Sequence, residues 1–109
     1  MRLLFAGLML IATTSATLAL DPAEQRGFTF VQANCAKCHA TGLHGESPVA
    51  VAPPFRTLHF RYPIEDLAES LGEGIVVGHP TMPQFRLDPA QVNDVIAYLK
   101  SLEKPAASE

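Results

Sequence analysis

The chain has 109 residues and a net charge of −3, from 8 basic and 11 acidic residues. This length predicts one small domain. The chain has no basic stretch with interleaved aromatic residues, so the sequence does not indicate nucleic-acid binding. The apolar run at 3–12 is shorter than the roughly 20 residues that cross a bilayer.

Residues 1–19 have the features of a secretory signal peptide. The basic start Met1-Arg2 precedes the apolar run, and the small residues Thr17 and Ala19 precede the expected cleavage site. Cleavage after Ala19 leaves a mature domain of residues 20–109 with no stable membrane insertion. An uncleaved membrane anchor is the alternative, in which the run extends through Leu20.

A first helix is expected to begin after Asp21, which caps it, with Pro22 at the first helical position. Gly27 lies inside this helix, where glycine costs about 1 kcal/mol relative to alanine. Such a cost is usually offset where a second backbone comes close. At helical spacing one face of the helix carries Ala23, Gly27, Phe30, Val31 and Asn34.

The motif Cys35-Ala36-Lys37-Cys38-His39 is typical of covalent haem attachment. Each thiol adds across one vinyl group of the porphyrin, and the adjacent imidazole binds the iron. The other histidines lie at spacings that match no common zinc pattern, and no βαβ pattern supports a thioredoxin-like site. Haem c is therefore the predicted cofactor, with thiol redox chemistry or zinc as alternatives.

Two segments follow the motif and its glycine-containing loop. Arg61 or Tyr62 is expected to contact a haem propionate, although a solvated surface role is the alternative for both. Residues 63–71 predict a two-turn helix that Gly72 and Gly74 end. Its inward residues are expected to be Ile64, Leu67, Ala68 and Leu71.

Met82 is the only methionine outside the leader, and it lies between Pro80 and Pro83. A core methionine more often lies on a helix or a strand, whereas a proline-bracketed loop holds a side chain at a fixed point. An axial sulfur ligand needs such a position. The rival ligands are His79 and His59, and an open iron site is the remaining alternative.

The last helix is expected to begin after Asp88-Pro89, and its apolar stripe contains Val92, Val95, Ile96, Leu99 and Leu102. The chain has a glycine eight residues before the first motif cysteine and a final helix with the sequence DVIAYLK. In these two features it resembles the single-domain monohaem c-type cytochromes of mitochondria and bacteria. The resemblance implies an all-α cytochrome c fold, whose first and last helices cross around one covalently bound haem. The matching positions are Gly27, Val31, Val95 and Tyr98, and Val31 stands where the family often has an aromatic residue.

The resemblance also implies roles for the site residues. Cys35 and Cys38 hold the haem covalently, and His39 and Met82 are the two axial ligands of the iron. A proline carbonyl accepts the second ring hydrogen of His39; Pro53 matches best, with Pro54 as the alternative.

Ligands on both sides keep substrates from the iron, which implies an electron carrier rather than an enzyme. We expect a periplasmic monomer that exchanges single electrons in transient complexes with a dehydrogenase donor and with an oxidase or cytochrome acceptor. It could equally serve as the haem subunit of such an enzyme. Lys37, Arg86 or the loop 52–55 is expected to face the partner. The alternative functions are a five-coordinate or bis-histidine haem protein that binds a gas or reduces peroxide, and a haem-free thiol oxidoreductase.

Overall fold

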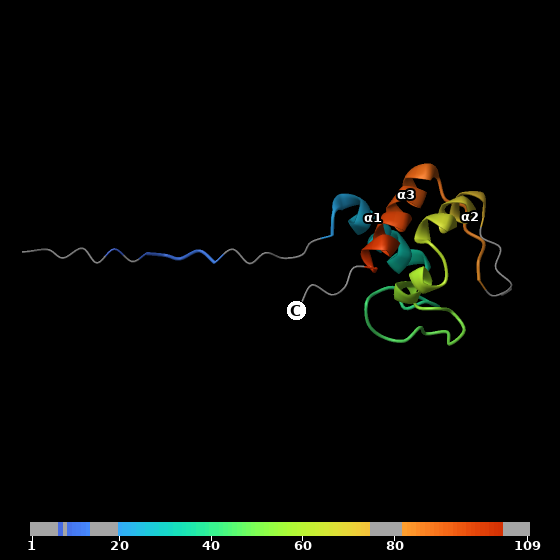
Figure 1. Ribbon diagram of the computed structural model, residues 1–109, viewed down its shortest axis with the longest axis horizontal. Coiled ribbons are helices and arrows are strands. Elements are labelled where there is room, and N and C mark those ends of the chain that lie inside the picture. The colour runs from blue at the N-terminus through green and yellow to red at the C-terminus, as the bar shows by residue number, and fades with distance from the viewer. Residues whose placement is uncertain (1–6, 8, 14–19, 75–81, 104–109) are drawn as a thin grey trace, which may run out of the picture.

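The computed structural model describes residues 7, 9–13, 20–74 and 82–103, and in these ranges the secondary structure is helical without strands. The elements are α1 (Pro22–Asn34), η1 (Phe55–Phe60), η2 (Ile64–Asp66), α2 (Leu67–Glu73) and α3 (Pro89–Ser101), where η denotes a 3₁₀ helix (Figure 1). This confirms the expected all-α fold. The expected cleavage site at Ala19 lies outside the described residues, and within them no helix is long and apolar enough to cross a membrane.

Both long helices begin as their sequences predict. The Asp21 carboxylate accepts a hydrogen bond from the Glu24 N–H at 2.9 Å. At the start of α3 the bonding is reciprocal: Asp88 accepts from the Gln91 N–H at 2.8 Å, and the Gln91 side chain accepts from the Asp88 N–H at 3.1 Å. Each bond satisfies a backbone donor that the helix itself leaves unpaired.

Helices α1 and α3 cross at Gly27, as predicted. A Cβ atom at Gly27 would lie 2.0 Å from the Asp94 carbonyl oxygen and 2.7 Å from Cβ of Tyr98, so only hydrogen fits there. The rings of Tyr98 and Phe28 lie 5.5 Å apart, tilted by 60°. Phe28 thus supplies the aromatic contact at the crossing, while Val31 fills the core at 1% exposure.

The middle of the chain differs from the prediction in two places. The expected helix at 63–71 begins as the 3₁₀ turn η2, and α2 continues through Gly72 to Glu73. Gly72 therefore does not end the helix. Gly74 does, with a φ of 110° that an L side chain rarely adopts.

The 3₁₀ helix η1 was not expected from the sequence. Phe55 and Leu58 are three residues apart, so both lie on the same face of this helix, and both are buried. In Figure 1 the loop after Cys38, in green, and η1 lie on the same side of the domain, away from α2. The Phe55 N–H donates to the Ala40 carbonyl at 2.9 Å and ties the two segments together.

Candidate functional site

A cavity of about 210 Å³ lies between α1, α3, α2 and η1, and its lining is almost entirely apolar. A pocket of this kind suits a large apolar group held by a few polar anchors. The apolar side chains come from every helix except η2: Phe30, Val31, Phe55, Leu58, Leu67, Leu71, Val95 and Leu99, with Phe85 and Leu87 from the segment before α3.

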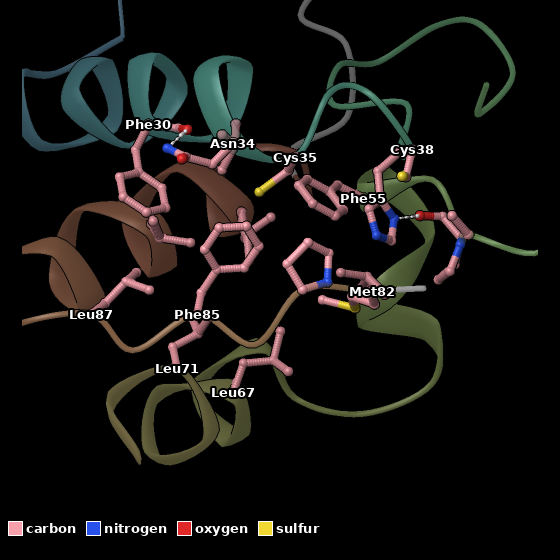
Figure 2. Close-up of a pocket in the computed structure, with 18 of the residues that line it drawn as sticks. Phe30, Asn34, Cys35, Cys38, Phe55, Leu67, Leu71, Met82, Phe85 and Leu87 are labelled. Atoms are coloured by element: carbon pink, nitrogen blue, oxygen red, sulfur yellow. Dashed lines mark hydrogen bonds between the residues drawn. The ribbon is translucent and has the colours of Figure 1, made fainter. Parts of the chain in front are cut away.

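Cys35, Cys38 and His39 all line this cavity (Figure 2). Helix α1 ends at Asn34, and the Cys38 and His39 N–H groups both donate to the Cys35 carbonyl, at 3.2 and 3.0 Å. This turn lets three residues within a five-residue segment face one cavity. The motif is therefore assembled as the sequence predicts.

Both cysteines are free thiols. Burial, and to a smaller extent the neighbouring Cys38, raise the pKa of Cys35 to about 11. The Cys35 thiol therefore stays protonated near neutral pH, unlike the low-pKa thiol of a typical thiol oxidoreductase. This argues against the haem-free redox alternative.

His39 is held in one orientation by the loop that follows it. Its Nδ1 lies 2.8 Å from the Pro53 carbonyl oxygen, which can only accept a hydrogen bond. Nδ1 is therefore the protonated nitrogen, and Nε2 is left with a lone pair for a metal ion. The choice of Pro53 over Pro54 is confirmed, because the Pro54 carbonyl instead accepts from the Thr57 hydroxyl at 2.8 Å.

The loop itself is anchored at several points. The Val49 N–H donates to the Cys38 carbonyl at 3.1 Å, and the Ser47 hydroxyl accepts from the Ala40 N–H at 3.0 Å. Tyr98 of α3 donates a hydrogen bond from its hydroxyl to the buried carbonyl of Thr41. The last helix therefore supports the loop that carries Pro53, a contact that the sequence pattern did not reveal.

Met82 also lines the cavity and is half-buried, below Cys38 in the view of Figure 2. Among the described histidines, His39 alone lines it: His44 is exposed, and the ring of His59 stacks on Phe60 at 4.0 Å. His79 lies outside the described residues. The structure thus brings Met82 and His39 to one cavity and leaves His59 out of it.

Of the two residues expected at a propionate, Tyr62 lines the cavity and Arg61 does not. Burial raises the pKa of Tyr62, so its hydroxyl remains a donor at neutral pH. Arg56 was not singled out from the sequence. Among the described residues its Nη1 atom has no hydrogen-bond partner although it is buried, so this residue of η1 carries an unused donor.

The donor set fits haem c. The lining matches an apolar macrocycle, two free thiols match its two vinyl groups, and an oriented imidazole and a thioether match an iron with two axial positions. No group of three or more His, Cys, Asp or Glu side chains in the described ranges could hold a metal ion, so these residues give the zinc alternative no support.

Comparison with known proteins agrees with this fit. The sequence matches the cytochrome c family over residues 24–103. A cytochrome c-553-like protein of Synechocystis sp. is 35% identical over 92 residues, which cover 81% of this chain and 77% of that protein. No solved structure matches. The chain belongs to the cytochrome c family and is a monohaem c-type cytochrome, a carrier of electrons on covalently bound haem c.

Proposed function

We propose that this cytochrome is an exported carrier of single electrons in which His39 and Met82 bind the haem iron from opposite sides. The observation that supports this most strongly is the 2.8 Å contact of His39 Nδ1 with the Pro53 carbonyl, together with the position of Met82 in the lining of the same cavity. A fixed imidazole and a thioether are the axial pair that raises the reduction potential of a c-type haem.

Each part of the chain has a distinct task in this proposal. When bound, haem c supplies a one-electron couple between ferric and ferrous iron. Cys35 and Cys38 hold it covalently, and Pro53 fixes the ring orientation and the basicity of His39. The apolar lining excludes water, so that few solvent dipoles rearrange when the haem gains or loses one electron. Of Tyr62 and Arg61, only Tyr62 lines the cavity, so Tyr62 is the residue that would donate a hydrogen bond to a haem propionate.

The alternative roles would require Met82 to leave the iron. Gas binding or peroxide reduction needs an open axial position. A bis-histidine site needs His79, since His59 stacks on Phe60 and does not line the cavity. The position of Met82 favours the carrier.

The deciding experiment is absorption spectroscopy of the matured protein with axial-ligand variants. We expect a low-spin spectrum with the weak red band that a methionine–ferric iron bond gives. Met82→Ala should abolish that band and yield a high-spin spectrum, whereas the control variants His59→Ala and His79→Ala should retain it. A band that survives Met82→Ala, or is lost in His79→Ala alone, would contradict the axial assignment.

Export to the periplasm is the second part of the proposal. Its support is the residue pattern of 1–19 and the attachment chemistry, in which haem is joined to thiols outside the bacterial inner membrane. The mature protein should begin at Leu20 when recovered from a periplasmic fraction, which N-terminal sequencing checks. Its partners would be a dehydrogenase on the donor side and an oxidase or second cytochrome on the acceptor side. A role as an enzyme's haem subunit uses the same site.

A further inference from the structure

The loop that brings Pro53 to His39 has almost no apolar anchorage. None of residues 42–52, all of which belong to the described part of the chain, is buried. The large apolar side chains of this loop are exposed instead: Leu43, Val49 and Val51. Burial of apolar surface therefore does not fix the loop. The position of the Pro53 carbonyl depends on the hydrogen bonds that tie the loop to the rest of the domain.

Two of these hydrogen bonds join the same pair of segments. The Nδ1 atom of His39 lies 2.8 Å from the Pro53 carbonyl oxygen. The carbonyl of Ala40, the next residue after His39, accepts from the Phe55 N–H at 2.9 Å, and Phe55 lies two residues after Pro53. Because both bonds connect the residues after Cys38 with the residues at Pro53, a displacement of Ala40 changes the geometry of the His39 bond as well.

Thr41, which follows Ala40, is buried and bonded to both long helices. Its hydroxyl donates to the side-chain oxygen of Gln32 on α1 at 3.2 Å, and its carbonyl accepts from the hydroxyl of Tyr98 on α3. Gln32 is exposed and its bond is long for two oxygen atoms, whereas Tyr98 is 3% exposed and packs against Phe28. A hydrogen bond between buried groups is the stronger kind, so Tyr98 is the main anchor of this end of the loop.

We propose that Tyr98 is a positioning residue for His39, which lowers the reduction potential of the holoprotein by holding the Pro53 carbonyl against Nδ1. This rests on the proposed function, in which the other ring nitrogen of His39 binds the iron. A hydrogen bond from Nδ1–H raises the basicity of the ring, and a more basic ring stabilises ferric iron more than ferrous iron. A weaker bond between His39 and Pro53 should therefore raise the reduction potential.

The sign of the shift separates this role from a general loosening of the fold. Without the Tyr98 hydroxyl, the buried Thr41 carbonyl loses its donor and turns toward another one, which displaces Ala40 and lengthens the His39 bond. Positioning therefore predicts a higher potential in the variant. Water that enters a loosened cavity would instead stabilise the extra charge of ferric iron and would lower the potential.

Spectroelectrochemical titration of the holoprotein measures the potential. One electron is added to the ferric haem in this titration, and no covalent bond is broken. Tyr98→Phe keeps the ring and removes only the hydroxyl. We expect the equilibrium constant for reduction to rise about threefold, which is about 28 mV at about 59 mV per tenfold change. An unchanged or lowered potential would overturn the proposal.

Val92→Ala is the matched control on the same helix. Val92 is buried in α3, lies near Gly72 of α2 and does not line the haem cavity, so its truncation weakens packing without touching the loop. The variant should unfold at a lower denaturant concentration and keep the wild-type potential. A shift as large as that of Tyr98→Phe would assign the effect to looser packing of α3 and would exclude a positioning role.

Proton NMR of the ferrous holoprotein reads the bond between His39 and Pro53 directly. The Nδ1 proton should exchange with solvent severalfold faster in Tyr98→Phe than in the wild type, and Val92→Ala should leave its exchange rate unchanged. A wild-type exchange rate in Tyr98→Phe would show that Tyr98 does not hold this bond. Failure of the proposed function has a different signature: the wild-type protein would lack a reversible one-electron couple. The exchange rate of the Nδ1 proton would still decide the role of Tyr98 in that case.

Discussion

The hydroxyl of Tyr98, near the end of α3, donates a hydrogen bond to the carbonyl of Thr41, which is 57 residues earlier in the chain. Thr41 lies two residues after His39, at the start of the loop that ends in Pro53, the acceptor for the His39 ring. The contact therefore connects the helix crossing to the environment of the proximal ligand.

Tyr98→Phe removes this bond and keeps the ring that packs against Phe28. We expect the free energy of unfolding of the holoprotein to fall by about 1–3 kcal/mol, because the buried Thr41 carbonyl is left without this donor. Urea titration followed by circular dichroism measures the loss. Thr29→Ala is the control, because it removes an exposed side-chain bond to the Gln25 carbonyl on α1, and it should cost less. Equal losses would show that the Tyr98 bond adds nothing specific.

Burial raises the pKa of Tyr98 above that of an unfolded chain, which predicts a pH dependence. A group whose pKa is raised on folding contributes stability that is complete below the unfolded value, about 10, and is lost as pH rises through the folded value. The wild-type free energy of unfolding should therefore fall as the pH rises above about 10. Tyr98→Phe cannot ionise there and should show a shallower fall in the same titration. Parallel curves would exclude a contribution from Tyr98.

The two crossing helices could be predicted from sequence because their signals are local, and the resemblance to c-type cytochromes implied that they cross. Asp-Pro starts, the spacing of apolar residues and a costly glycine inside a helix can each be read without knowing the partner. Gly27 and Tyr98 accordingly meet as expected. The choice of Phe28 as the aromatic partner depended on the rotation of α1 against α3, which no local pattern specifies.

The residues of the cavity also divide into those that the sequence predicted and those that depend on packing between distant segments. Cys35, Cys38, His39 and Pro53 came from a motif with fixed spacing and from a resemblance, and the structure brings all four together. The η1 turn and the unpaired Arg56 nitrogen follow from how residues 55–60 pack against distant segments, so the sequence alone did not indicate them. Coordination of the iron by Met82 remains a prediction.

The two helix caps differ in a way that mutation can measure. Asp88 takes part in a reciprocal capping box with Gln91, whereas the Asp21 side chain makes one bond to a backbone N–H. Asp88→Ala should cost about 1 kcal/mol or more of unfolding free energy, and Asp21→Ala a few tenths less, because the latter breaks one bond and not an interlocked pair. Thermal unfolding of the two variants under one set of conditions compares them directly. A larger loss for Asp21→Ala would contradict the ranking.

Two helical glycines should respond to alanine in opposite directions. At Gly27 the added methyl group would lie 2.0 Å from the Asp94 carbonyl oxygen, which is rigid backbone, so α1 and α3 must separate. Gly27→Ala should cost about 3 kcal/mol or more, or should prevent holoprotein from accumulating. At Gly72, inside α2, a new Cβ would meet Cγ2 of Val92 at 3.9 Å, an ordinary contact. Gly72→Ala should therefore stabilise the holoprotein by about 0.5–1 kcal/mol, through the better helix propensity of alanine. Chemical denaturation of both variants tests the pair, and a tolerated alanine at Gly27 would mean that the helices do not cross as closely as the backbone indicates.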